Sequence, residues 1–168
     1  MCSSWHTRAK WGSVVMHLAL PLLLLASSCS CGREKLPDQV YGHFIPIPDT
    51  SWQRGEEYFF AVLVEEPSEE YRVMGVMRTN PHYKLNSIGV GVLRESPSRQ
   101  FDRQVIQVPT KKEDQLPYGG YNLWMREFLV EEGKVFDEKG VYTYSFQQLM
   151  TDEEIHGVVE IGLIIERK

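Results

Sequence analysis

Apolar and polar residues alternate with a period of two along most of the chain after residue 38, as they do in β-strands that bury one face. The alternating segments and short apolar runs are separated by stretches rich in glycine, proline and charged residues. About eight strands are predicted in this way, over residues 40–47, 57–64, 71–78, 87–94, 101–108, 123–130, 141–148 and 158–167. Strands at intervals of roughly 10–15 residues, without a convincing long helix, predict an all-β fold: an antiparallel β-sandwich, either Ig-like or a jelly roll.

Three of these segments carry more detailed predictions. Residues 57–64 (EYFFAVLV) are apolar on both faces, which predicts a central, buried strand. Residues 40–47 also look strand-like, but Pro46 and Pro48 restrict the segment to the edge of a sheet because proline donates no backbone hydrogen bond. Residues 123–130 fit helical spacing nearly as well as strand spacing, and the strand is preferred because glycines lie on both sides of the segment.

Residues 151–156 (TDEEIH) predict one short helical turn between the last two strands. Thr151 and Glu154 have the spacing of a capping box, in which each side chain satisfies a free backbone amide of the turn. Gly157 is then placed to end the turn in a left-handed conformation. His156 precedes this glycine, where the end of a helical turn favours a protonated side chain. The segment is therefore interpreted as scaffold rather than as a site of chemistry.

The first 28 residues have the organisation of a secretory signal peptide. A short basic region precedes an apolar run of about a dozen residues, whereas a membrane-spanning helix needs about 20. Small residues then precede Cys29, an arrangement similar to the lipobox at which bacterial lipoproteins are cleaved and lipidated. Cys29 is the predicted lipidation site, and Cys31 is its competitor. The alternatives left open are an ordinary secreted protein and a start at Met16 instead of Met1.

Cleavage before Cys29 defines the predicted organisation of the chain. Residues 1–28 would be a lipoprotein signal peptide, residues 29–38 a polar lipidated tether, and residues 39–168 a single β-sandwich domain. Cleavage removes two of the 18 basic residues and none of the 23 acidic ones, which leaves a net charge of −7. This charge argues against nucleic acid as a partner and against electrostatic docking on anionic lipid, so the membrane contact should be the acyl chains. No cysteine follows Cys31, so no disulfide is predicted in the domain.

No pattern in the predicted domain points to catalytic residues, a metal site or a cofactor. The histidines His43, His82 and His156 are far apart in sequence and lack the spacing of a ligand pair. The domain has no G-x-S-x-G nucleophile elbow and no phosphate-binding glycine loop. A hydrolase with a pair of carboxylates stays open as an alternative, because sequence does not give the distance between two carboxyl groups.

Aromatic residues provide a candidate binding surface. Tyr118, Tyr121 and Trp124 cluster in the glycine-rich stretch PYGGYNLW, and aromatic rings beside flexible backbone can stack on sugars or hold a protein partner. The alternative is that Trp124 belongs to the core while the tyrosines cover a sheet edge. The first interpretation supports a second functional hypothesis, a carbohydrate-binding β-sandwich lipoprotein.

The C-terminal third carries a more specific pattern: GVYTYSFQQLM, one acidic turn, then I-x-G-V-x-x-I-G-L-x-I-E. It resembles the end of the gliding-motility lipoprotein H (GldH) family of Bacteroidetes. The matching positions are Gly140, Tyr142, Thr143, Gln148, Met150, Ile155, Gly157, Val158, Ile161, Gly162, Leu163, Ile165 and Glu166. A weaker upstream match consists of Trp52, Arg78, Asn80, Tyr83 and Asn86. The match is loose between residues 95 and 125, where the family tends to show Trp-x-Gly-x-Gly.

The resemblance implies a lipid-anchored accessory protein of the cell envelope, associated with the gliding machinery and linked to type IX secretion. It implies partners among the envelope proteins of a motility or secretion assembly, bound without catalysis. In the family an acidic run after the lipidated cysteine often marks export to the cell surface. The chain has no such run, so a periplasm-facing anchor is expected. The outer membrane is expected rather than the inner membrane. The family positions expected to be structural are Arg78, Asn80, Tyr83, Asn86, Tyr142, Gln148, Gly157, Gly162 and Glu166.

Overall fold

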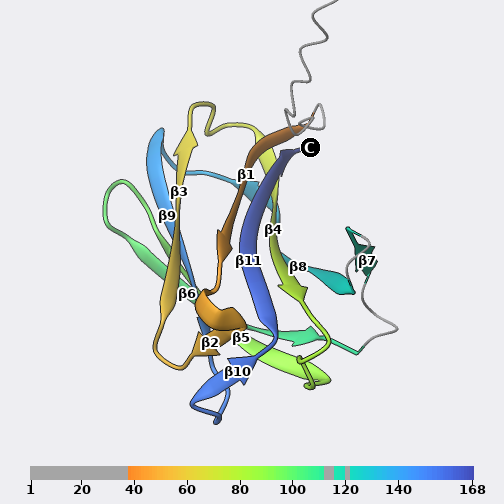
Figure 1. The fold of residues 1–168 in the computed structure, drawn as a ribbon. Coiled ribbons are helices and arrows are strands. Elements are labelled where there is room, and N and C mark those ends of the chain that lie inside the picture. Colours follow the sequence, from red (N-terminus) through yellow and green to blue (C-terminus); the bar gives the residue numbers. More distant parts are fainter. Residues whose placement is uncertain (1–37, 112–115, 120–121) are drawn as a thin grey trace, which may run out of the picture. The chain divides into compact units, whose positions relative to one another are not determined.

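The computed structural model describes residues 38–111, 116–119 and 122–168. Eleven strands and one 3-10 helical turn are formed by these residues (Figure 1). They are β1 (Gln39–Pro46), the turn η1 (Pro48–Thr50), β2 (Ser51–Gln53), β3 (Glu57–Val64), β4 (Glu70–Thr79), β5 (Ser87–Glu95), β6 (Phe101–Pro109), β7 (Leu116–Tyr118), β8 (Leu123–Val135), β9 (Gly140–Gln148), β10 (Glu154–His156) and β11 (Val158–Arg167). The predicted signal peptide, the predicted lipidation site Cys29 and the aromatic residue Tyr121 lie outside the described residues.

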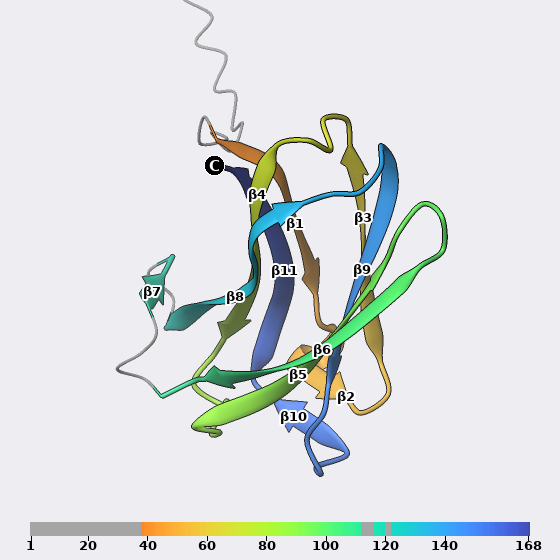
Figure 2. The same ribbon diagram turned by 180° about the vertical axis from the view of Figure 1, so that it is seen from behind.

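The strands pair antiparallel throughout and form two large sheets and one small one. The five-stranded sheet has the order β1-β11-β4-β8-β7, and the four-stranded sheet has the order β3-β9-β5-β6. Strands β2 and β10 form a separate two-stranded ribbon. Figures 1 and 2 show the two large sheets on either side of the core, with the ribbon near the end where β5 and β11 begin. The predicted all-β, antiparallel sandwich is confirmed.

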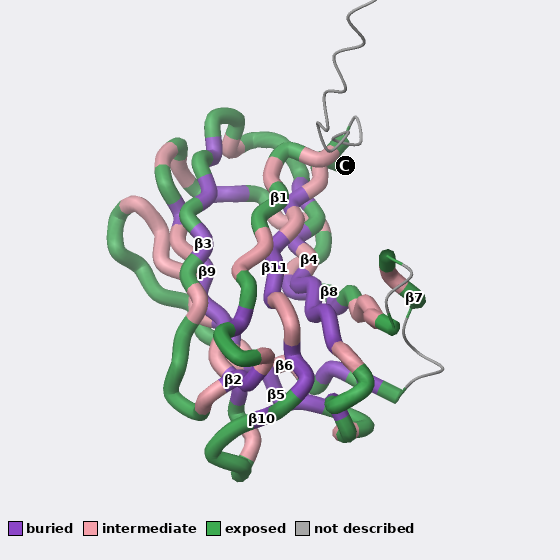
Figure 3. Tube along the Cα trace, viewed as in Figure 1, coloured by how far each residue is buried: buried purple, intermediate pink, exposed green. Residues whose placement is uncertain are grey.

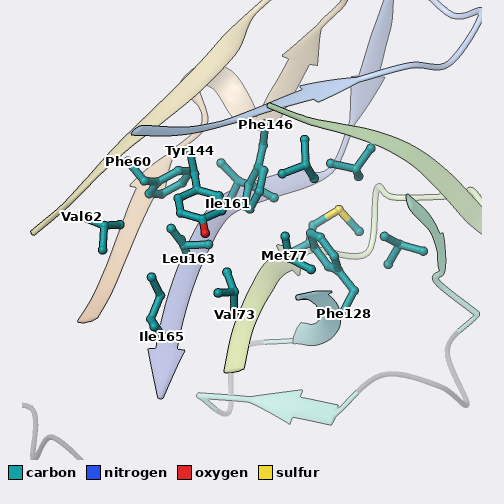
Figure 4. Close-up of a cluster of buried hydrophobic side chains, with 14 of the residues drawn as sticks. Phe60, Val62, Val73, Met77, Phe128, Tyr144, Phe146, Ile161, Leu163 and Ile165 are labelled. Atoms are coloured by element: carbon teal, nitrogen blue, oxygen red, sulfur yellow. The ribbon is translucent and has the colours of Figure 1, made fainter. Parts of the chain in front are cut away.

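The core lies between the two large sheets, where side chains from both inner faces meet (Figure 4). The Phe146 ring of β9 lies 5.2 Å from the Phe60 ring of β3 and 5.9 Å from the Phe128 ring of β8, so it joins the two sheets. Fully buried residues of β4 and β11, such as Val73 and Ile161, complete the contact. Burying each such side chain contributes about 1.5–3 kcal/mol. Buried and exposed positions alternate clearly along the second half of β3 in Figure 3, whereas the second half of β4 is buried at every position.

All eight predicted strands are present, with ends that differ by a few residues from the prediction. Strand β1 lies at the edge of its sheet, as the prolines predicted, and residues 123–130 form the first part of β8. Strands β2, β7 and β10 were not predicted because each contains only three residues, which is too short for a period of two to be recognised.

The prediction that residues 57–64 form a central strand is wrong. This segment is β3, which pairs only with β9 and lies at the edge of the four-stranded sheet. One of its apolar faces contributes Phe60 and Val62 to the core, but Phe59 and Leu63 on the other face are 59% and 61% exposed. Within the described residues no further layer covers that second face, so its apolar character does not reflect burial.

The helical turn predicted for residues 151–156 is also wrong. Glu154, Ile155 and His156 form strand β10 and pair with β2, and the helical turn of the described residues is η1 instead. Long-range pairing overrides the local capping pattern, because Ile155 is buried opposite the fully buried Trp52. Gly157 does have a positive φ, of +87°, but it joins two strands rather than ending a helical turn.

Candidate interaction surface

The four-stranded sheet presents an outer face that no other element covers within the described residues. Its inner positions, such as Phe60, Val92 and Phe146, are buried in the core, so the alternate positions of each strand point outward. We call these positions, together with the adjacent Leu149, the outer apolar face. Its members are Glu57, Phe59, Ala61, Leu63, Gly91, Leu93, Glu95, Phe101, Arg103, Val105, Val141, Thr143, Ser145, Gln147 and Leu149.

Large apolar side chains gather on this face. Of the ten large hydrophobic residues that are exposed among the described residues, six belong to it. These six are Phe59, Leu63, Phe101, Val105, Val141 and Leu149. Single exposed apolar residues are common on soluble proteins, but six of them on one sheet face are typical of a surface that binds another molecule. The outer apolar face is therefore the candidate interaction surface.

Cross-strand pairing arranges the face in rows that run from β3 through β9 and β5 to β6. The first row is Glu57, Gln147, Gly91 and Val105; the second is Phe59, Ser145, Leu93 and Arg103; the third is Ala61, Thr143, Glu95 and Phe101.

A shallow hollow of about 130 Å³ lies over Gly91, with Leu93, Arg103, Val105 and Leu149 among its walls. Gly91 lets Leu149 pack closely over β5, because the Leu149 side chain lies 3.1 Å from the place a Cβ would take.

The outer surface of the five-stranded sheet carries a different arrangement, centred on Arg78 of β4. Arg78 is only 6% exposed, and its guanidinium lies 4.1 Å from the centre of the Phe44 ring and 4.0 Å from that of the Tyr118 ring. It also forms an ion pair with Glu160 of β11. The Phe44 ring lies directly on Gly162, where any Cβ would overlap it. Arg78 thus fixes β1 and β7 against the middle of the sheet.

The predicted aromatic surface is divided by this arrangement. Tyr118 of β7 stacks on Arg78, whereas Trp124 of β8 lies opposite Pro117 and is half-buried. Tyr118 itself lies opposite Leu123, so Tyr118 and Trp124 occupy neighbouring positions that point to opposite faces of the strand pair. The two described aromatics therefore do not form one flat platform. Sugar binding by this segment stays a prediction.

A serine, a histidine and a glutamate meet where β2 and β10 pair. The Ser51 hydroxyl donates to Glu154 Oε2 at 3.0 Å and lies 3.3 Å from His156 Nδ1, while His156 Nε2 lies 3.1 Å from Glu154 Oε1. Although these residue types occur in hydrolases, the serine proton is held here by the carboxylate rather than by the histidine, and a nucleophile needs its base within hydrogen-bond reach of that proton. Gln53 adds a 2.9 Å hydrogen bond to Glu154. The cluster ties β2 to β10.

This cluster predicts a local dependence on pH. Hydrogen bonds from Gln53 and Ser51, then the charge of His156, hold the pKa of Glu154 below its ordinary value of 4.5. A lowered folded-state pKa means that the stabilisation is complete above pH 4.5 and is lost as the pH falls through the folded-state value. We expect backbone amides of β2 and β10 to lose hydrogen-exchange protection in that range before the core strands do. In a Glu154→Gln variant the amides of β2 and β10 should no longer lose protection earlier than the core strands as the pH falls. If they still do, the titration of another group causes the loss.

The family positions in the loop after β4 converge on Gly157. The backbone amide of Asn80 donates to the Gly157 carbonyl at 2.9 Å, and the Asn80 side chain accepts from the amide of His82 at 2.9 Å. Tyr83 packs its backbone against Gly157 and its hydroxyl lies 3.1 Å from the Thr110 hydroxyl. These contacts join the β4–β5 loop to the start of β11.

The remaining family positions also make contacts within the fold. Tyr142 exchanges two 3.2 Å hydrogen bonds with the backbone of Glu138, and the Gln148 side chain accepts from the amide of Met150 at 2.8 Å. The carbonyl of Asn86 accepts from the Thr110 amide at 2.8 Å. Glu166 lies opposite Arg72 on β4. Such contacts suit the structural role expected for these residues, a role that stays a prediction.

Comparison with known proteins decides the family. The family model of the GldH lipoproteins matches residues 39–165, which is most of the chain. The chain belongs to the GldH lipoprotein family. No curated protein matches the sequence. The GldH match covers both large sheets, so the outer apolar face and the Arg78 cluster belong to the family domain itself.

Membership of the GldH family makes this a lipoprotein associated with gliding motility. Among residues 38–111, 116–119 and 122–168 no helix has the length and hydropathy needed to cross a membrane. The same residues contain no group of three or more histidine, cysteine or acidic side chains placed to hold a metal ion.

The sequence did not identify the outer apolar face. The available signal was the second apolar row of residues 57–64, which was interpreted as burial. A weaker signal was the pair of apolar residues Phe101 and Val105 in the predicted strand over residues 101–108, both of which are exposed in the structure.

Proposed function

We propose that this GldH-family protein is a lipid-anchored, non-catalytic component of the cell envelope that works by binding protein through its outer apolar face. Its partners would belong to a motility or secretion assembly. The observation that carries the proposal is the concentration of exposed Phe59, Leu63, Phe101, Val105 and Val141 on one uncovered sheet face. Removing about 300 Å² of such apolar surface from water contributes about 7 kcal/mol before the entropic cost of association is subtracted.

The proposed anchor is a lipidated Cys29, followed by a tether to residue 38 and a single domain over residues 39–168. Nine residues of extended chain reach at most about 32 Å, so the domain would stay close to the membrane surface. A periplasm-facing position agrees with the absence of an acidic run after Cys29. The proposed membrane is the outer rather than the inner one.

Complementation of a deletion strain tests the proposed function. In a strain whose gliding or secretion fails without the gene, Phe59→Glu and Val105→Glu are expected to restore the activity at least about tenfold less well than the native chain, because a buried charge is costly at a docking face. Leu129→Glu is the matched control, since Leu129 is also exposed on a strand but lies on the other sheet. Equal membrane levels of all variants show that folding is intact.

Two further measurements complete the experiment. Affinity capture of the native protein from solubilised membranes should recover envelope proteins, and Cys29→Ser should move the protein to the soluble fraction. Full complementation by both face variants would overturn the proposed role of the outer apolar face, and membrane retention of Cys29→Ser would overturn the proposed anchor.

A further inference from the structure

The outer apolar face has the features of a self-complementary surface. Building on the proposed function, we infer that the molecule bound across this face is a second copy of the same chain. The two copies are related by a two-fold axis that runs parallel to the strands, between β9 and β5. Their four-stranded sheets then pack face to face, as sheets do within a β-sandwich.

The direction of the axis follows from where the tether joins the domain. Residue 38 precedes β1, and β1 begins at the end of the sandwich where β11 finishes, since Gln39 pairs with Glu166. Two in-plane axes can bring the same face of two sheets together. An axis across the strands puts residue 38 of the two copies at opposite ends of the pair, whereas an axis along the strands puts both at the same end. The second arrangement lets two lipid-anchored copies share one membrane without either tether having to run back along the length of the domain.

This axis places each row of the face opposite the same row of the second copy, with the order of the four strands reversed. Strand β3 of one copy then faces β6 of the other, and β9 faces β5. In the third row, the exposed Phe101 of one copy lies over Ala61 of the other; in the second row, Leu93 lies over Ser145. A large side chain therefore meets a small one in both rows, which is the pattern that allows two sheets to interdigitate.

The charges at the two edges of the face complete the match. The axis brings Phe59 of one copy over Arg103 of the other, beside the hollow above Gly91, where an aromatic ring and a guanidinium attract each other. Glu57, one row further along β3, then lies diagonally across from the same Arg103. Among the described residues neither Glu57 nor Arg103 forms an ion pair within its own chain.

The area of the outer apolar face determines the affinity expected between the two copies. Four strands about 4.8 Å apart and about eight residues long, at about 3.3 Å per residue, cover roughly 500 Å². Stable interfaces bury about 800 Å² on each partner, so this area lies at the weak end. Anchoring both copies in one membrane raises their effective concentration without any new contact. The pair should therefore form on the membrane and dissociate readily in dilute detergent.

Cysteine cross-linking in membranes tests the two-fold arrangement. Two differently tagged full-length chains, one with Ala61→Cys and one with Phe101→Cys, are co-expressed in a Cys31→Ser background, and the isolated membranes are treated with a short bismaleimide. Across the proposed axis Ala61 faces Phe101 at about 10 Å, whereas two Ala61 positions are about 17 Å apart. The mixed product is therefore expected in about fivefold or greater excess over either same-position product. Adding Phe59→Glu to both chains should abolish it, and adding Leu129→Glu should not.

The outcomes separate this inference from the proposed function. Absence of cross-linked product, or similar yields of all three products, overturns the second copy as the occupant. If Phe59→Glu still fails in complementation under that outcome, the face binds a different protein and the proposed function stands. If Phe59→Glu and Val105→Glu both complement fully, the proposed role of the outer apolar face is overturned whatever the cross-linking shows. Membrane levels equal to the native chain confirm that the cysteine variants fold.

Discussion

Replacing Gly157 by alanine is expected to lower the free energy of unfolding by about 3–5 kcal/mol. Two effects add at this position. Its φ of +87° is a backbone conformation that alanine adopts only with strain. In addition, a Cβ would overlap the backbone of His82 and Tyr83, which cannot move aside as a flexible side chain could. Urea unfolding, followed by tryptophan fluorescence, measures the loss.

Gly55 provides the matched control for this prediction. Its φ is +91°, close to that of Gly157, but no atom lies within 4 Å of the place a Cβ would take. Gly55→Ala should therefore cost only the conformational strain, about 1 kcal/mol. If the two substitutions cost the same, the close approach of the β4–β5 loop to Gly157 contributes nothing and the family glycine is explained by backbone conformation alone.

Arg78→Ala is expected to lower the free energy of unfolding by about 2–4 kcal/mol. The substitution removes the guanidinium between the rings of Phe44 and Tyr118 and leaves Glu160 without its partner. Because Glu160 is partly exposed, water can solvate its charge and keeps the loss below that of a fully buried pair. Strand β7 should open first, since Tyr118 rests on Arg78, and its amides should exchange faster than those of β8.

Two variants distinguish stacking from charge. Arg72 lies on the same strand and pairs with Glu132 at the surface, so Arg72→Ala should change stability little. Arg78→Lys keeps the positive charge but not the flat guanidinium, and should recover less than half of the loss. Full recovery with lysine would show that the ion pair with Glu160 matters and that the two aromatic contacts do not.

The periodic part of the sequence was sufficient to predict most of the fold. Segments such as 141–148 alternate because one face enters the core, and this requirement acts on every second residue. The pattern fails where long-range pairing decides. Thr151 and Glu154 match a capping box, yet Glu154 accepts hydrogen bonds from Ser51 and Gln53, about a hundred residues earlier in the chain. No local pattern contains that partner.

The outer apolar face could not be predicted from the sequence for a different reason. An apolar row on β3 looks the same in sequence whether it is buried by another layer of the fold or left open for a partner. Phe59 and Leu63 therefore suggested a central strand, and only the strand order places them at an exposed edge. The sequence pattern favoured the aromatic cluster instead, although the Tyr118 ring stacks on Arg78 within the fold.

The position of β1 at a sheet edge determines how a mechanical load would enter the domain. The predicted tether leads directly into this strand, which pairs with β11 through seven residue pairs. Backbone hydrogen bonds between antiparallel strands lie perpendicular to the strands, so tension along β1 loads them together in shear rather than one after another. A domain held by its lipid while its partner moves would therefore resist force with the whole length of the β1–β11 ladder.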